Sequence, residues 1–145
     1  MLRVTKLTDY ATVVLACLAK APARVHSASE LAELAGLEPP TVSKVLKPLA
    51  RAGLVEAFRG SQGGYRLAKP ARQISLHAVV EAMEGRLGMT ECTGDHSQCG
   101  LEATCGIQGH WQRINDVIAD ALRAVSVADL GQSGRKPIPL SLAKA

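Results

Sequence analysis

The sequence contains very few aromatic residues. Phe, Trp and Tyr together make up 3% of the 145 residues, whereas hydrophobic residues as a whole reach 47%. The core must therefore consist mainly of Leu, Val and Ala, a composition that favours packed helices over a β-sandwich. The chain also lacks an apolar run of the roughly 18 residues that a transmembrane helix requires, because Asp9 and Thr12 interrupt the apolar stretch near its start. We expect a mainly α-helical, cytoplasmic protein that contacts no membrane.

Acidic residues are scarce in the first half of the chain. Residues 1–72 carry eleven Lys and Arg against five Asp and Glu, whereas residues 73–145 carry six against eight. Positive charge confined to one half favours contact with a polyanion through that half. The sequence also lacks a glycine-rich nucleotide loop, paired carboxylates in a cleft-forming setting and a helix-borne metal motif. It therefore predicts a binding protein with no small-molecule substrate, and not an enzyme.

Three helices are expected in the first third of the chain. The first extends from a cap at Thr8 to about Lys20. The stretch SASE at 27–30 is typical of a capping box, in which Ser27 caps the second helix and Glu30 reaches back to it. This second helix ends at Gly36, and after the turn LEPP a third helix covers TVSKVLKPLARAG. Two short helices joined by a tight turn predict a helix-turn-helix.

The third helix is polar and basic on its outer face. Such a helix fits the major groove of DNA, where short polar side chains reach base edges and Lys and Arg neutralise phosphates. We predict DNA contacts from Thr41, Ser43, Lys44, Lys47 and Arg51. Pro48 lies inside this helix and has no amide hydrogen for the Lys44 carbonyl, which predicts a kink or an early end.

A short hairpin follows the third helix. LVEAF and YRLA are expected to be two strands, joined by the glycine-rich segment RGSQGG. Glycines allow such a tip to approach a sugar-phosphate backbone closely. Directly after a helix-turn-helix, this hairpin is typical of a wing, and we predict that Arg59 and Arg66 contact phosphates or the minor groove.

Two further helices are expected in the second half. One covers residues 74–85, begins at Ser75 and is closed by Gly85. The other extends from about Gln108 to Ala128, with apolar residues recurring every three or four positions. These residues are Trp111, Ile114, Ile118, Ala121 and Val125. A lone helix with such a seam needs a partner, which favours a homodimer bound to a palindromic double-stranded DNA operator.

Three of the four cysteines lie within the loop between these two helices. Six residues separate Cys92 from Cys99, and five separate Cys99 from Cys105. Structural zinc sites usually use closer cysteine pairs, whereas thiolates on a flexible loop suit an iron–sulfur cluster. The spacing alone leaves an iron–sulfur cluster, a zinc site and a metal-free thiol switch open. Cys17 lies among apolar residues of the first helix and is expected to be a buried hydrophobic residue.

The chain resembles the bacterial iron–sulfur winged-helix transcriptional regulators of the IscR/NsrR family. The resemblance covers about residues 1–130 and is carried by LTDYA, ASELAELAGL, VSKVLKPLARAGLV, RGSQGGYRLAKP, ISLHAVVEAMEG and the three-cysteine loop. The segment LKPLARAGLVEAFRGSQGGY is most similar to the subgroup that regulates the SUF system of cluster assembly. The resemblance implies a 2Fe-2S or 4Fe-4S cluster held by Cys92, Cys99 and Cys105.

The resemblance leaves several residues as the fourth cluster ligand. IscR-like proteins use a histidine three positions after the last cysteine, but this sequence has Gln108 there. His110 and His96 lie nearby and are alternative ligands. NsrR-like proteins use an aspartate near the N-terminus of the other subunit, and Asp9 matches that position. The order of preference is Asp9 and then His110.

Together these patterns predict a winged helix-turn-helix regulator with four segments. Residues 1–86 form the DNA-binding domain, 87–107 the cluster-binding loop, 108–130 the dimerisation helix and 131–145 a flexible tail. The implied function is repression of genes for iron–sulfur cluster assembly, with the state of the cluster controlling DNA affinity. The alternatives are a regulator of the same fold that uses its three loop cysteines as a metal-free thiol switch, or one that senses nitric oxide.

Overall fold

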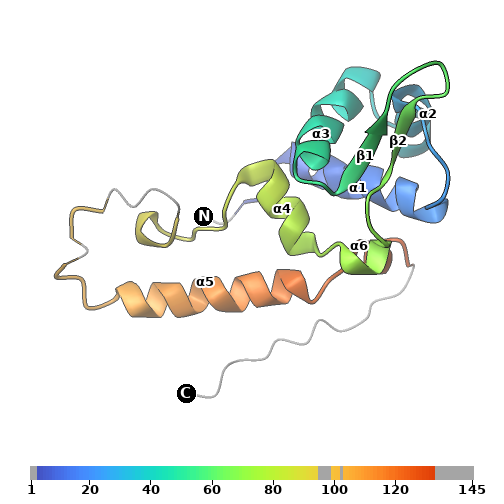
Figure 1. The fold of residues 1–145 in the computed structure, drawn as a ribbon. Helices are drawn as coiled ribbons and strands as arrows, with labels where there is room; N and C mark the ends of the chain where they lie inside the picture. Colours follow the sequence, from blue (N-terminus) through green and yellow to red (C-terminus); the bar gives the residue numbers. More distant parts are fainter. Residues whose placement is uncertain (1–2, 95–98, 102, 133–145) are drawn as a thin grey trace.

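The computed structural model describes residues 3–94, 99–101 and 103–132 (Figure 1). The helices are α1 (Lys6–Lys20), α2 (Ala28–Ala35), α3 (Pro39–Arg51), α4 (Leu76–Glu84), α5 (Gln108–Arg123) and α6 (Val127–Leu130). Strands β1 (Val55–Phe58) and β2 (Gly64–Leu67) form a two-stranded antiparallel sheet. Short 3₁₀ turns occur at η1 (Ala71–Gln73) and η2 (Glu91–Thr93). The predicted mainly α-helical winged fold is confirmed.

Helix α1 begins earlier than the sequence predicted. Its N-cap is Thr5, whose side chain accepts a hydrogen bond from the amide of Thr8. The predicted cap at Thr8 is therefore wrong: this residue lies within the first turn and is 1% exposed. Its hydroxyl is instead turned toward α4, where it donates to the carboxylate of Glu84.

The helix-turn-helix is formed by α2 and α3. The capping box of α2 is confirmed, since Ser27 accepts from the Glu30 amide and Glu30 accepts from the Ser27 amide. Gly36 ends α2 at φ 65°, a left-handed conformation that favours glycine. Helix α3 starts at Pro39 and continues past Pro48 to Arg51, so the helix does not end early at the proline.

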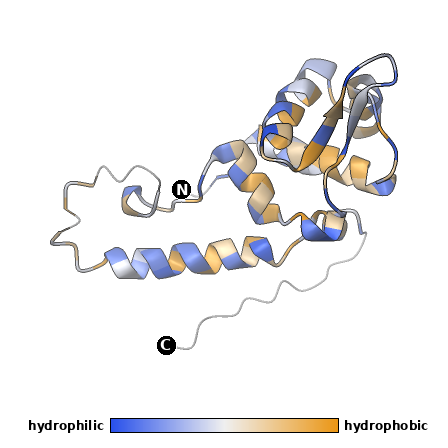
Figure 2. Ribbon diagram, in the orientation of Figure 1, coloured by the Kyte–Doolittle hydropathy of each residue, from blue (hydrophilic) through white to orange (hydrophobic). Residues whose placement is uncertain are grey.

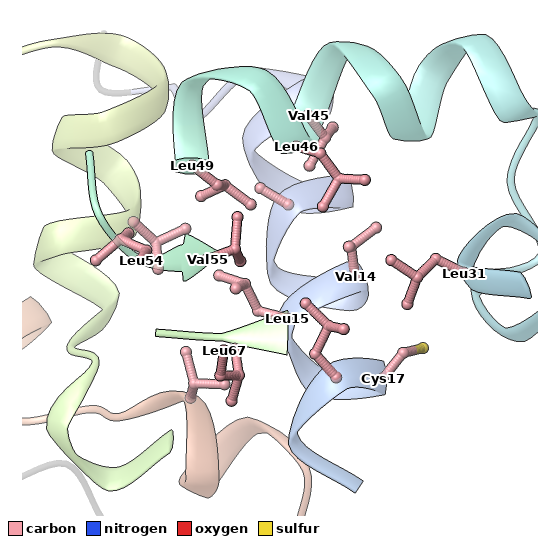
Figure 3. Close-up of a cluster of buried hydrophobic side chains, with 14 of the residues drawn as sticks. Val14, Leu15, Cys17, Leu31, Val45, Leu46, Leu49, Leu54, Val55 and Leu67 are labelled. Carbon is pink, nitrogen blue, oxygen red and sulfur yellow. The ribbon is translucent and has the colours of Figure 1, made fainter. Parts of the chain in front are cut away.

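The core is made almost entirely of Leu, Val and Ala, as the shortage of aromatic residues required. Figure 3 shows Val14 and Leu15 of α1 facing Leu31 of α2 and residues of α3 and the two strands. Leu15, Leu31 and Leu46 are each 0% exposed. Cys17 is 8% exposed among them, so its predicted role as a buried hydrophobic residue is confirmed.

The wing is attached to the segment that connects α1 and α2. Strands β1 and β2 pair from Val55 opposite Leu67 to Phe58 opposite Gly64. On the other edge of β2, Tyr65 pairs with His26 as an isolated bridge. Gly64 has φ 156°, and a Cβ placed on it would lie 2.3 Å from the His26 carbonyl oxygen. This glycine is therefore required by the backbone of its own domain.

The predicted single helix from Gln108 to Ala128 is wrong. Helix α5 ends at Arg123, and Ser126 opens a separate helix, α6, through a capping box with Asp129. The chain turns there because the Leu76 amide donates to the Val125 carbonyl and the Val127 amide donates to the Ile74 carbonyl. Val127 is 0% exposed and belongs to the core, so Val125 is not part of an α5 seam.

The winged helix-turn-helix and α5 occupy different parts of the molecule (Figure 1). Helices α1–α3 and the two strands gather at one side, and we call this unit the head. Helix α4 packs against both the head and α5, and η2, which carries Cys92, contacts α5. Within the ranges that the structure describes, every helix is too short or too polar to cross a bilayer.

Candidate nucleic-acid interface and cysteine site

The outer face of α3 carries positive charge that no acidic side chain of the described residues neutralises. Ser43, Lys44, Lys47 and Arg51 are exposed, whereas Thr41 is half-buried at the start of the helix. Over the described ranges, Lys44, Lys47 and Arg51 make no ion pair with another side chain. The buried opposite face, Val42, Val45, Leu46 and Leu49, fixes this orientation. The face can therefore meet a polyanion without breaking an existing contact.

The two predicted wing arginines have different surroundings. Arg59 is exposed at the tip beside Gly60. Arg66 forms an ion pair with Glu56 across the hairpin at 2.9 Å, and its guanidinium lies 4.9 Å from the centre of the Phe58 ring. Only Arg59 therefore offers DNA a charge that is not already paired within the wing.

The cysteine loop begins at a short ordered turn. Thr90 caps η2 through reciprocal hydrogen bonds with Thr93, and its hydroxyl lies 3.1 Å from Cys92 Sγ. Cys92, Cys99 and Cys105 are half-buried and carry free thiols. Among the described residues, no three His, Cys, Asp or Glu side chains come close enough together to hold a metal ion.

The candidate fourth ligands lie on two different helices. Asp9 is exposed in the first turn of α1, where its carbonyl accepts from the hydroxyl of Thr12. His110 is exposed in the first turn of α5, two residues after Gln108. His96 lies outside the described residues.

The chemistry of the donor set fits an iron–sulfur cluster. Three free thiols on one loop supply the soft ligands that iron prefers, and none is committed to a disulfide. A carboxylate or imidazole would complete the set with a weaker iron ligand. Among the described residues, these groups are not gathered at one point.

Glu84 links the end of α4 to the beginning of α1. One oxygen, Oε1, accepts from the Thr5 amide at 2.9 Å, from the Thr5 hydroxyl at 2.6 Å and from the Thr8 hydroxyl. Partial burial raises the pKa of Glu84, but the hydrogen bonds from Thr5 and Thr8 outweigh it and the net pKa is lowered. The ionised carboxylate is therefore the form that holds these two helices together.

Asn115 links α5 to the entrance of the cysteine loop. It is 7% exposed, and its Oδ1 accepts from the Met89 amide at 3.2 Å. The sequence predicted a functional role for neither Asn115 nor Glu84. Asn115 could have been noticed as a polar residue beside the apolar positions of the helix. No neighbouring residue indicates the role of Glu84, because its partners lie 76 and 79 residues away in the sequence.

A second face of α5 remains uncovered. Ile107 is 59% exposed and Ile114 is 43% exposed, and Figure 2 shows hydrophobic and hydrophilic residues alternating along the helix. Trp111, Ile118 and Leu122 line a groove of about 460 Å³ with residues of α4 and the segment before α1. Two large apolar side chains exposed in the N-terminal half of a helix suit it to pairing with another protein surface.

Comparison with known proteins agrees with this architecture. Residues 4–133 match the family model described as Rrf2, iron-dependent transcriptional regulator. Protein aau3 of Rhizobium meliloti (strain 1021) is 34% identical over 130 residues, which span 89% of this chain and 84% of that protein. A putative HTH-type transcriptional regulator of Neisseria meningitidis serogroup A, NMA1593, is 40% identical over 57% of this chain and 55% of its own length.

Two solved structures have the same fold. CymR (YrzC), the global cysteine regulator of B. subtilis, is 26% identical with a TM-score of 0.69, over 90% of this chain and 97% of CymR. T. potens IscR is also 26% identical, with a TM-score of 0.65 over 89% of this chain and 85% of IscR. Rrf2 proteins are regulators and not enzymes, which confirms the prediction that this protein is not an enzyme. With a family model matched over almost its whole length, the chain belongs to the Rrf2 family of transcriptional regulators.

Proposed function

We propose that the protein is a homodimeric repressor whose iron–sulfur cluster, held by Cys92, Cys99 and Cys105, controls its affinity for a palindromic operator. The observation that carries this proposal is the combination, in one chain, of a basic face on α3, unpaired among the described residues, and three free thiols in the loop before α5. The description of the matching family as iron-dependent supports the same conclusion. Genes for iron–sulfur cluster assembly are the proposed targets, following the similarity to IscR.

The head supplies DNA binding. Ser43, Lys44 and Lys47 enter the major groove from the exposed face of α3, with Thr41 at its edge. Arg51 and Arg59 meet the phosphates on either side, and Arg66 approaches the minor groove while it holds the hairpin together through Glu56. Two heads joined through α5 read two half-sites, which explains why a palindrome is expected.

The cysteine loop supplies the sensing step. A cluster held by Cys92, Cys99 and Cys105 would supply a redox-active centre, and a fourth ligand other than a thiolate would hold its iron more weakly. Asp9 from the other subunit is the proposed fourth ligand, with His110 as the alternative. Because Asp9 lies on α1 of the head and the cysteines lie in the loop before α5, ligation from both places would fix the head relative to the dimer helix.

A cofactor measurement and a DNA-binding measurement test this function. Anaerobically purified protein is expected to be brown, with visible absorption and acid-labile sulfide that Cys92→Ala, Cys99→Ala and Cys105→Ala each remove. A footprint on the DNA upstream of its own coding sequence is expected to cover two half-sites. Protein that stays colourless after reconstitution, or that binds this DNA equally with and without its cluster, contradicts the proposal.

A metal-free thiol switch is the second candidate. The similarity to CymR, a cysteine regulator by its description, favours it. Under this alternative, oxidation of the loop cysteines changes DNA affinity in iron-free protein. Iron-free protein whose affinity is the same under reducing and oxidising conditions contradicts it.

A further inference from the structure

Hydrogen bonds connect the head to the cysteine loop in two consecutive steps. The first is at Glu84, the last residue of α4, which is bonded to Thr5 and Thr8 of α1. The second is at Asn115, which holds the Met89 amide at the end of the connecting segment. Residues 85–88 are the only ones between these two anchored positions, so the connection is short.

The segment that Asn115 holds at Met89 leads directly to Cys92. Met89 precedes Thr90, which caps η2 and whose hydroxyl lies 3.1 Å from Cys92 Sγ. Cys92 is thus three residues from a backbone amide fixed to α5 and eight residues from a carboxylate fixed to α1. Any rearrangement of Cys92 must either strain these bonds or move the elements that they join.

The surroundings of Asn115 and Glu84 each favour one orientation of the side chain. Asn115 is a buried polar side chain on an otherwise apolar face, where an unpaired amide would cost free energy, so its bond to Met89 determines its orientation. Glu84 collects three donors on one oxygen, an arrangement that charge strengthens. Neither residue lies on the DNA-facing surface of α3 or among the cysteines.

We propose that Glu84 and Asn115 are positioning residues that couple the state of Cys92 to the placement of the head on α5. The inference deepens the proposed function, because it names the residues through which the loop regulates DNA binding. Glu84 fixes the head to α4, and Asn115 fixes the start of the loop to α5. Breaking either link separates the two ends while leaving the DNA-reading side chains in place.

The first test measures thiol reactivity and needs no cofactor. Iron-free, reduced full-length protein is treated with iodoacetamide, and the alkylation rate of each cysteine is followed by mass spectrometry. Glu84→Ala and Asn115→Leu are expected to raise the rate at Cys92 about tenfold, the effect of losing about one such hydrogen bond. Glu84→Gln and Asn115→Asp, which keep an acceptor oxygen, are expected to restore most of the protection.

Internal controls separate positioning from general destabilisation. Cys17 is buried in the core, so its alkylation rate reports opening of the head as a whole. Glu81→Ala on α4 and Gln112→Leu on α5 are matched changes at exposed positions outside the two links. Equal acceleration at Cys17 and Cys92, or no acceleration at Cys92, would overturn the proposal.

The second test measures regulation. The ratio of DNA affinities between cluster-loaded and cluster-free protein is expected to fall toward one in Glu84→Ala and Asn115→Leu, with each variant still binding DNA. An unchanged ratio in these variants contradicts the coupling. A ratio of one in the unaltered protein contradicts the proposed function instead, and the alkylation result then still decides whether the two residues link the head to the loop.

Discussion

The backbones of His26 and Tyr65 are joined by two hydrogen bonds. The His26 amide donates to the Tyr65 carbonyl at 2.9 Å, and the Tyr65 amide donates to the His26 carbonyl at 2.7 Å. This pair attaches the second strand of the wing to the segment before α2. The position of the wing relative to the helix-turn-helix is therefore set by backbone contacts, and the close approach leaves no room for a side chain at Gly64.

We expect Gly64→Ala to destabilise the protein by about 1–3 kcal/mol, because the added methyl group meets the His26 carbonyl and the backbone is in a region that favours glycine. Chemical denaturation measures the loss. Gln62→Ala, at the exposed wing tip, is the control and should change stability by less than about 0.5 kcal/mol. A Gly64→Ala variant as stable as the original protein would contradict the role given to the His26–Tyr65 pair.

The salt dependence of DNA binding should differ between Lys47 and Arg66. Lys47 is exposed and unpaired among the described side chains, so Lys47→Gln should lower the slope of log affinity against log salt by about 1. Arg66 is already paired with Glu56, so Arg66→Gln should lower it by less. Fluorescence anisotropy over a salt series gives both slopes. Arg123→Gln on α5 should leave the slope unchanged, and equal effects at Lys47 and Arg66 would argue against the pairing in solution.

Acid should weaken the contribution of Glu84 to stability. Its pKa is lowered in the folded protein relative to the ordinary value of 4.5, so the carboxylate stabilises the fold above that pH, and the effect is lost as pH falls through the lowered pKa. We expect the original protein to exceed Glu84→Gln in unfolding free energy by no more than about 1 kcal/mol at pH 7, because the group is solvent-exposed. The difference should shrink below pH 4.5.

Glu81→Gln serves as the comparison for this titration, since Glu81 is on the same helix and faces His77 instead of α1. Denaturation curves at several pH values between 3 and 8 follow both variants. A Glu84→Gln difference that stays constant down to the most acidic pH would show that the carboxylate charge does not stabilise the link.

The uncovered face of α5 should control the oligomeric state. Ile114→Lys places a charge on the exposed apolar row, and we expect the dimer dissociation constant to rise at least about tenfold, or about 1.4 kcal/mol. Sedimentation velocity over a concentration series measures this change. Gln112→Lys, on the polar side of the same helix, should leave the dissociation constant unaltered. An Ile114→Lys variant that remains as dimeric as the original would place the interface elsewhere.

Local signals were sufficient for much of the head. Ser27 and Glu30 lie three residues apart and cap α2 by contacts within one turn, and Gly36 and Gly85 end helices at positive φ. Such features depend on neighbouring residues, so a single sequence reveals them. The apolar stripe of α3 likewise determined which of its residues face outward.

Features that depend on distant residues were mispredicted or missed. Thr8 looked like a helix cap because nothing nearby distinguishes it from Thr5, and its hydroxyl is directed by Glu84, 76 residues away. The seam of α5 seemed to continue to Val125 because the spacing persists, whereas hydrogen bonds to Ile74 and Leu76 redirect the chain. The fourth cluster ligand stays a prediction for a similar reason, since its proposed source is another subunit.

An isolated β-bridge pairs Ser75, before α4, with Ser126, after α5. The polypeptide departs from the head near Gly85 and rejoins it at this bridge, and Val127 then helps to fill the same core as Leu15. The segment between Gly85 and Ser126 begins and ends at the head. Its length therefore adds little to the entropic cost of folding the head. Insertions or deletions within the cysteine loop should therefore leave the folding of the DNA-reading body nearly unchanged.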